Sequence, residues 1–142
     1  MNLSRMAAHI VGSKRILILD DDKVRHDAFD NIYDDCLVEH AYTYSEFVNK
    51  LNSGKWDLIH LDHDLGDHTS GDVWIDGWGS TREYNGKNAV DRVCELDNSK
   101  RPDEIIVHSI NPSGAKTMCQ SLTRAGIPNK WEPYGEIDTT SE

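Results

Sequence analysis

The sequence lacks the patterns of a disulfide-rich, zinc-binding or membrane-spanning protein. Its three cysteines, Cys36, Cys94 and Cys119, are far apart and form no CxxC pair, so neither a disulfide framework nor a zinc knuckle is indicated. No apolar run approaches the roughly 20 residues of a transmembrane helix, and residues 1–14 lack the apolar stretch and cleavage site of a signal peptide. We therefore expect a cytoplasmic protein that does not bind membranes.

Basic residues are scarce as well. The chain has 15 Lys and Arg against 25 Asp and Glu, a formal net charge of −10, which argues against a protein that coats DNA, RNA or lipid by neutralising phosphates. A small anionic ligand remains compatible with this charge. The acidic residues comprise seventeen Asp and eight Glu, and Asp is favoured at caps, turns and metal sites rather than inside helices.

Several familiar catalytic motifs are also missing. The chain contains no GxGxxG, HExxH or GxSxG pattern, so dinucleotide binding, zinc-protease and serine-hydrolase chemistry have no support. The segment Gly114-Ala115-Lys116-Thr117 shares only part of a Walker phosphate loop, because the leading Gly is absent and the Lys does not directly follow the Gly. A nucleoside triphosphatase is therefore not indicated.

Apolar runs and amphipathic stretches alternate along the chain. This alternation predicts strands at 15–19, 37–42, 56–61, 104–108 and around Trp131, separated by helices at 23–32, 45–51, 88–96 and 115–122. Successive parallel strands need helical crossovers, which cover both faces of the sheet. We therefore predict an α/β fold in three layers, with a doubly wound, five-stranded parallel sheet.

A length of 142 residues predicts a single domain. We place this domain at residues 14–135, after a leader of residues 1–13 and before a disordered tail of residues 136–142. Within the domain, residues 66–86 are rich in Gly and contain two Trp. This stretch is too long for an ordinary connection, so we predict an insertion loop there that is functional or disordered.

Acidic residues gather where two of the predicted strands end. Asp20, Asp21 and Asp22 follow the first strand, and Asp62 and Asp64 follow the third. These strands are commonly neighbours in a doubly wound sheet, and ligands bind beyond the strands' carboxyl ends. Two carboxylates about 4 Å apart repel by roughly 1 kcal/mol even in water, so the arrangement calls for a cation or a shared proton. A functional acidic site is favoured over the alternative that these residues only cap helices.

Two histidines are predicted to lie at the same edge. His63 stands between two of the acids, and His108 ends the fourth strand. Imidazole can exchange a proton near neutral pH or bind a transition metal. We favour a functional role for this pair, whereas His40 and His60, which lie within strands, are interpreted as packed structural residues.

The segment after the fourth strand predicts an anion site. Residues 109–115 pass from a strand into a helix through Pro112 and Gly114. Backbone amides at such a turn point toward an anion, and the helix dipole adds to this attraction. Acids, histidines and an anion-binding turn are therefore expected together.

In this pattern the chain resembles the receiver domains of response regulators, over about residues 14–134. The resemblance rests on an acidic pair after the first strand, an Asp after the third and a hydroxyl residue after the fourth, namely Asp21, Asp22, Asp62 and Ser109. Receivers are flavodoxin-like α/β proteins. In ordinary receivers a Lys followed by Pro ends the fifth strand, but Glu132-Pro133 stands there and Lys130 comes two positions early.

Two segments are more similar to a receiver-derived family, the cyclic-phosphate processing receivers. They are Leu61-Asp62-His63-Asp64-Leu65-Gly66 and His108-Ser109-Ile110-Asn111-Pro112-Ser113-Gly114, with Met118 beyond. The resemblance implies a phosphoesterase that acts on cyclic nucleotides or on RNA ends carrying a 2′,3′-cyclic phosphate. It also implies a metal-assisted action, for which we expect a divalent cation, Mg²⁺ or Mn²⁺. The acidic surface argues separately against binding of extended nucleic acid.

The same resemblance implies roles for individual residues. The catalytic group would be His63, His108 and Asp62. The metal or polar cradle would consist of Asp21, Asp22, Asp62 and Asp64. The phosphate contacts would come from Ser109, Asn111, Gly114 and Arg25, although Arg25 can also be interpreted as a solvated residue of the first helix.

Other interpretations stay open. The chain could be a divergent receiver that takes phosphate on Asp62 or binds partners without catalysis, or a silent binder of cyclic nucleotides. The displaced Lys130 favours an enzyme over a receiver, because a receiver needs that cation to respond to aspartyl phosphate. Trp74 and Trp78 in the insertion fit either a lid that stacks on a base or local packing. The sequence does not indicate an oligomeric state.

Overall fold

The structure is a computed structural model that describes residues 14–65 and 73–136. Five parallel strands form one sheet in the order β2-β1-β3-β6-β7. Their bounds are β1 Arg15–Leu19, β2 Leu37–Ala41, β3 Leu58–Leu61, β6 Glu104–Val107 and β7 Asn129–Trp131. The prediction of a doubly wound, five-stranded parallel sheet is therefore confirmed.

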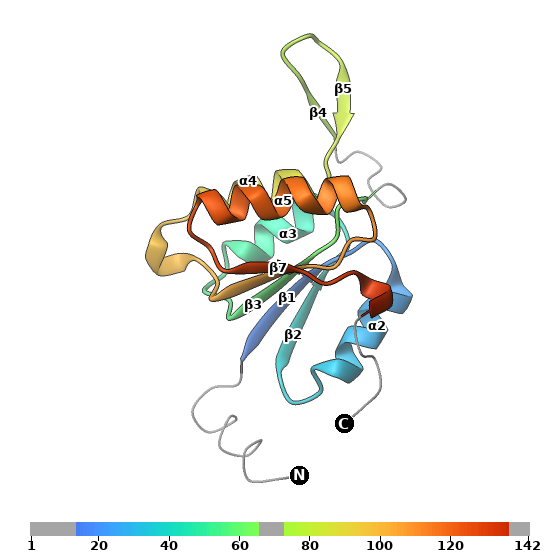
Figure 1. Cartoon of the computed structure of the whole chain (residues 1–142), viewed down its shortest axis with the longest axis vertical. Helices are drawn as coiled ribbons and strands as arrows, with labels where there is room; N and C mark the ends of the chain where they lie inside the picture. Colours follow the sequence, from blue (N-terminus) through green and yellow to red (C-terminus); the bar gives the residue numbers. More distant parts are fainter. Residues whose placement is uncertain (1–13, 66–72, 137–142) are drawn as a thin grey trace.

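Helices cover the two faces of this sheet and make three layers (Figure 1). The long helices are α2 Lys23–Ile32, α3 Tyr44–Leu51, α4 Gly86–Cys94 and α5 Pro112–Arg124. Short 3-10 turns follow at η2 Asn98–Lys100 and η3 Tyr134–Glu136. No helix of the described residues is long and apolar enough to cross a membrane.

The alternation of side chains along β1 divides the core into two parts. Leu17 and Leu19 point to the face covered by α3, α4 and α5, where most of the buried apolar residues lie. Ile16 and Ile18 point to the opposite face and pack with Phe29 of α2. Because successive residues of a strand face opposite sides, the residue that follows Leu19 faces α2.

The layer between the sheet and α2 is rich in histidine. His60 is buried, and its Nε2 atom lies 2.5 Å from the hydroxyl oxygen of Tyr33. His40 lies at the edge of this layer, with Nε2 2.8 Å from Asp30 and Nδ1 2.6 Å from Nδ1 of the buried His26. These contacts agree with the prediction that His40 and His60 are packed structural residues.

The predicted insertion loop contains a β-hairpin. Strands β4 Val73–Ile75 and β5 Thr81–Glu83 pair antiparallel, and the hairpin projects from the body of the molecule (Figure 1). Its turn is fixed by Asp76, whose Oδ1 accepts hydrogen bonds from the backbone N–H groups of Trp78 and Ser80. The prediction of a loop is wrong for these residues, because strands of three residues are too short to show an alternating pattern.

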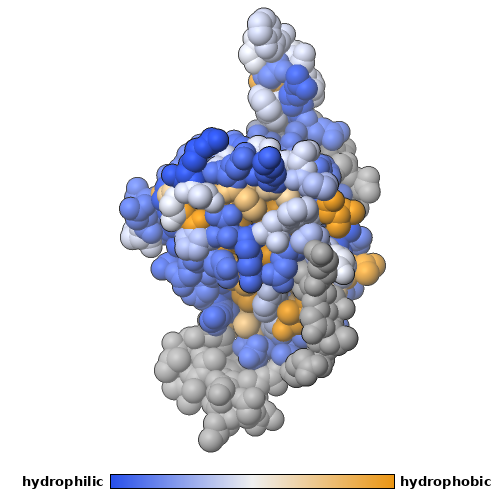
Figure 2. Space-filling model, viewed as in Figure 1, coloured by the Kyte–Doolittle hydropathy of each residue, from blue (hydrophilic) through white to orange (hydrophobic). Residues whose placement is uncertain are grey.

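The other predicted segments fall partly outside the described residues. The leader at 1–13, residues 66–72 of the insertion and the tail from residue 137 onward are not described. Residue 136, which we assigned to the tail, belongs to η3. Over the described part of the chain, Figure 2 shows a mostly hydrophilic face on which apolar residues form small, separate patches.

Candidate functional site

Three polar residues follow three neighbouring strands in register. Leu19 of β1 pairs with Leu61 of β3, which pairs with Val107 of β6. The next residue of each strand is therefore brought to one place at the carboxyl edge of the sheet, on the side that faces α2. These residues are Asp20, Asp62 and His108; all three are buried, and one ligand atom from each lies within 4.8 Å of the others.

Asp20 lies at the centre of this group. Its Oδ2 atom accepts hydrogen bonds from Nε2 of His108 and Nε of Arg25, both at 2.7 Å. Its Oδ1 atom accepts from Nη2 of Arg25 and from the backbone N–H of Asp22, both at 2.8 Å. Two donors on each oxygen use the hydrogen-bonding capacity of the carboxylate, so its burial is fully compensated.

These bonds keep Asp20 ionised. Burial by itself raises the pKa of the Asp20 carboxyl, but the hydrogen bonds from His108 and Arg25 outweigh this effect and hold the pKa well below its usual range. The bond to Asp20 in turn raises the pKa of Arg25. The charges of Asp20 and Arg25 are therefore permanent features of the site.

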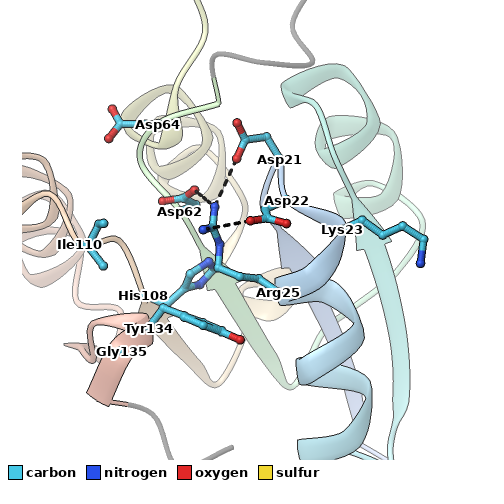
Figure 3. Close-up of a pocket in the computed structure, with 10 residues that line it drawn as sticks. All are labelled: Asp21, Asp22, Lys23, Arg25, Asp62, Asp64, His108, Ile110, Tyr134 and Gly135. Carbon is cyan, nitrogen blue, oxygen red and sulfur yellow. Dashed lines mark hydrogen bonds and ion pairs between the residues drawn. The ribbon is translucent and has the colours of Figure 1, made fainter.

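Arg25 is surrounded by carboxylates (Figure 3). Besides its two bonds to Asp20, it lies 3.4 Å from Asp21, 3.3 Å from Asp22 and 3.5 Å from Asp62. One guanidinium thus faces four acidic side chains, which leaves an excess of negative charge. Lys130, the displaced lysine of the receiver pattern, pairs with Glu132 instead.

The pKa of Asp62 is raised in these surroundings. Burial and the nearby charge of Asp20 together raise the pKa of its carboxyl to about 6, against the opposing effects of His108 and Arg25. Its Oδ1 atom accepts a hydrogen bond from the backbone N–H of His63 at 2.8 Å. Asp62 is thus the carboxylate of the group that changes protonation state near neutral pH.

His108 acts on the site through one nitrogen. The bond to Asp20 requires a hydrogen on Nε2, so Nδ1 of the neutral ring is an acceptor. Nδ1 is buried and has no hydrogen-bond partner within residues 14–65 and 73–136, and the ring packs against Phe29 and His60. A ligand cannot reach Nδ1, so any chemistry of His108 passes through Nε2.

The group opens into a cavity of about 610 Å³. Its wall includes Asp62, Arg25 and His108, together with Asp64 at the rim and Tyr134 from η3 (Figure 3). The cavity lies beyond the carboxyl ends of the strands, where ligands bind in sheets of this kind.

His63 contacts different residues from those that His108 contacts. It is one residue beyond Asp62 and therefore points to the opposite side of the sheet. Its Nδ1 atom lies 2.8 Å from Oδ1 of Asp64, and its ring covers Gly114, where an added Cβ atom would come within 2.6 Å of the ring. The two histidines of the predicted pair share no hydrogen bond among the described residues.

Backbone N–H groups of the predicted phosphate turn already donate hydrogen bonds to side chains of the same turn. Ser109 is buried and accepts from the backbone N–H of Asn111 at 3.0 Å. Asn111 caps α5, and its Oδ1 atom accepts from the backbone N–H of Gly114 at 3.1 Å. An anion would have to displace these bonds, whereas Arg25 presents a positive charge directly in the cavity.

The predicted metal cradle is only partly gathered at the buried group. Asp62 belongs to it, and Asp21 and Asp22 line the cavity, where Asp22 also caps α2. Asp64 lies at the rim and points away from Asp62 (Figure 3). Asp20 takes the central position instead.

Sequence reasoning counted Asp20 in the acidic site but gave it no individual role, and it did not consider Tyr134. Asp20 has a usable signal, since it is the first residue after a buried strand and must face α2. Tyr134 is held by a hydrogen bond from its backbone N–H to the carbonyl oxygen of His108 at 2.9 Å, and Arg25 lies 5.8 Å from the centre of its ring. It comes after the last strand, and no pattern in the sequence marks it.

The donors of the buried group suit a divalent metal ion. Asp20 and Asp62 offer carboxylate oxygens, which Mn²⁺ and related ions accept, and Nε2 of His108 becomes a third ligand only when it gives up the hydrogen that it donates to Asp20. The excess of carboxylates over the single guanidinium of Arg25 favours a second cation. These residues could therefore hold a metal ion, which would compete with Arg25 for the oxygens of Asp20.

The parallel sheet and the acidic group at its carboxyl edge define a receiver-type α/β protein. The structure is similar to a CheY-like receiver domain from Methylobacillus flagellatus, with a TM-score of 0.64, 14% identity and 92% of each chain covered. A CheY-like receiver domain protein from Methanospirillum hungatei matches with a TM-score of 0.58 and 18% identity, over 90% of this chain and 86% of that one. At these identities the likeness establishes the receiver fold alone.

A response regulator from Burkholderia pseudomallei, solved with a phosphorylated aspartic acid, a calcium ion and citrate, matches with a TM-score of 0.56 and 16% identity. The match covers 83% of this chain but only 58% of that protein. No curated protein sequence matches. Residues 15–124 match the family described as the cyclic-phosphate processing receiver domain, and the chain belongs to that family.

Proposed function

We propose that this protein is a metal-assisted phosphoesterase that opens cyclic phosphates, either in cyclic nucleotides or at RNA ends. The proposal is carried by one observation, the buried group of Asp20, Asp62 and His108 at a cavity of about 610 Å³. Asp62, His108 and Arg25 line this cavity, and Asp20 lies buried behind them. The name of the family agrees with this substrate class.

Opening a cyclic phosphodiester requires an activated water, a proton for the leaving alkoxide and stabilisation of charge on the phosphoryl oxygens. Arg25 lines the cavity and offers positive charge to those oxygens. Asp62 can accept the proton of the water, because its pKa of about 6 lies near the working pH. A divalent cation held by Asp20 and Asp62 would supply Lewis-acid charge and lower the pKa of a bound water, in place of proton acceptance by Asp62.

The leaving alkoxide needs a proton donor, and His63 is the candidate. Its Nδ1 atom is oriented by Asp64 at 2.8 Å, so Nε2 is the atom that exchanges a proton with the ligand. Asp64 lines the cavity whereas His63 does not, so a ligand must extend past Asp64 to take a proton from His63. His108 instead positions Asp20 through the hydrogen bond from its Nε2 atom.

The test is hydrolysis of nucleoside 2′,3′-cyclic and 3′,5′-cyclic monophosphates with Mg²⁺, Mn²⁺ or EDTA, followed by chromatography of the products. We expect turnover with at least one ring type that requires the metal. Asp62→Asn and His108→Ala should reduce kcat/KM by about 100-fold or more, and His63→Ala should reduce mainly kcat.

The matched control is Asp103→Asn, which removes a carboxylate that pairs with Lys55 and is 66% exposed in its side chain. This variant should retain the wild-type rate, since Asp103 does not line the cavity. Absence of turnover with every nucleotide and metal combination overturns the proposal. Equal losses in Asp103→Asn and Asp62→Asn would also contradict it.

A divergent receiver is the second candidate, and the position of Arg25 favours it. Arg25 lies 3.5 Å from Asp62 and could supply the cation that Lys130 does not. Incubation with acetyl phosphate and Mg²⁺ should then add one phosphoryl group, detected by mass spectrometry, and Asp62→Asn should abolish this addition. Labelling without hydrolysis of cyclic phosphates would select this candidate over the enzyme.

A further inference from the structure

A second hollow lies beside the acidic cavity. It has a volume of about 850 Å³ and is enclosed by the β4–β5 hairpin and the start of α4. Asp64 lines both the hollow and the cavity. A ligand held in the cavity can therefore extend past Asp64 into the hollow.

One face of the hairpin forms the wall of this hollow. Trp74 pairs with Arg82 across the hairpin, and the alternation of side chains puts Asp76 and Tyr84 on the same face. All four line the hollow. Oδ2 of Asp76 lies 2.9 Å from Nε of Arg82, so this charged pair is neutral overall and leaves the aromatic rings as the main feature of the face.

The hairpin is anchored to the body by aromatic stacking. Tyr84 stacks on Tyr44 of α3, with ring centres 3.9 Å apart and planes 4° from parallel. Trp74 lies next to Tyr84, with ring centres 6.4 Å apart. The wall of the hollow is therefore a fixed platform, which suits a planar ligand because little ordering is needed on binding.

Two indoles of this wall are exposed to solvent. Trp74 is 36% exposed, and Trp78 at the tip of the hairpin is 92% exposed although it lines the hollow. Exposed indole surface is unfavourable in water, and aromatic platforms of this kind stack on nucleobases in proteins that bind single-stranded nucleic acids.

We propose that the hollow binds the nucleobase of a nucleotide whose cyclic phosphate occupies the acidic cavity, with the base stacked on Trp74 and Trp78. This inference rests on the proposed function, because it takes the phosphate site as given. Within the substrates of the proposed function, it adds that the base itself is bound, so an RNA end needs an accessible terminal base and cyclic phosphates of simple polyols are excluded as preferred ligands.

The experiment compares a ligand that has a base with one that lacks it. Adenosine 2′,3′-cyclic monophosphate and glycerol 1,2-cyclic phosphate are titrated into the full chain in EDTA, by calorimetry and by tryptophan fluorescence. We expect the adenosine ligand to bind at least tenfold more tightly and to quench the fluorescence. Trp78→Ala and Trp74→Ala should each weaken its binding by about fivefold or more, while the glycerol ligand binds all variants equally.

Ile75→Ala is the control, because Ile75 is 70% exposed and lies on the opposite face of the same hairpin. Trp78→Ala keeps the test valid if Trp74→Ala fails to fold, since the side chain of Trp78 is almost fully exposed. If the wild type binds both ligands with equal affinity, and the Trp variants bind the adenosine ligand as tightly as the wild type does, the nucleobase site alone is overturned. If neither ligand binds the wild type in EDTA, the nucleobase site is overturned, whereas the proposed function is decided separately by the hydrolysis assay with metal.

Discussion

The Nε2 atom of His108 lies 2.7 Å from the Oδ2 atom of Asp20, and both side chains are closed off from solvent. Eighty-eight positions separate them in the chain, so the contact exists only because β1 and β6 lie on either side of β3. A buried carboxylate held in this way links the stability of the fold to the chemistry of the site.

The first prediction concerns this contact. His108→Ala removes one of the four donors to Asp20 and leaves a buried carboxylate with an open acceptor, so we expect a loss of about 3–5 kcal/mol in the free energy of unfolding. Urea denaturation in EDTA measures it. His63→Ala is the comparison and should cost about 1 kcal/mol, since its ring bonds the exposed Asp64. Equal losses would show that the Asp20 contact adds nothing.

A second prediction follows from the pKa of about 6 that burial gives Asp62. The unfolded chain releases the proton of an Asp near pH 4, so between about pH 4 and pH 6 the folded protein binds more protons than the unfolded one. The contribution of Asp62 to stability must then fall as pH rises through this window. Its full cost is about 3 kcal/mol, reached above pH 6.

Asp62→Asn removes this titration. Urea denaturation in EDTA at pH 4.5, 6 and 7.5 should show the variant gaining stability over the wild type as pH rises. The lowered pKa of Asp20 acts in the other direction, but its effect is lost only below about pH 4, outside this window. A stability difference that does not change with pH would contradict the raised pKa of Asp62.

The strand ends of the site were predictable because the apolar runs stop abruptly at polar residues. Leu19 and Leu61 are buried, and Asp20 and Asp62 follow them directly. The parallel arrangement then brings such ends together, and the structure confirms it through the pairing of Leu19 with Leu61. A continuous apolar run is a strong signal of a central strand, since both faces of the sheet are covered.

Side-chain direction was the part that sequence reasoning missed. Three successive Asp residues look equivalent in the sequence, yet Asp20 is buried against His108 while Asp22 caps a helix. Likewise, His63 and His108 were expected at one edge, but an offset of one residue beyond the strand end sends the ring of His63 toward Gly114. The two-residue period of a strand predicts which face a side chain points to up to the last paired residue. Beyond the strand end, an offset of one residue is enough to change that face.

The third prediction uses the glycines that lie against the site. A Cβ atom at Gly86 would overlap the backbone carbonyl oxygen of Asp62, which cannot move without shifting the end of β3. A Cβ atom at Gly114 would meet the ring of His63, which can rotate away. Gly86→Ala should therefore cost at least about 3 kcal/mol of unfolding free energy and Gly114→Ala about 1–2 kcal/mol.

Gly77→Ala is the control for these two variants, because no atom lies within 4 Å of a Cβ atom built there. Thermal denaturation ranks the stabilities of the three variants. The ring signals of His63 in NMR spectra report the displacement of the ring in Gly114→Ala. A Gly86 variant as stable as the Gly77 variant would contradict the close approach of α4 to Asp62.

The last prediction concerns Arg25 and metal ions. Arg25 occupies the space among the carboxylates that a cation would share, so Arg25→Gln should destabilise the protein in EDTA by about 3–5 kcal/mol. The variant should regain more stability than the wild type gains when Mn²⁺ or Mg²⁺ is added, because a bound ion at 100 times its Kd contributes about 2.7 kcal/mol. The increase in Tm with metal measures this difference.

Lys55→Gln, which removes a surface cation paired with Asp103, should respond like the wild type. If neither the wild type nor Arg25→Gln responds to metal, Asp20, Asp62 and His108 hold no cation and Arg25 is their permanent counter-charge.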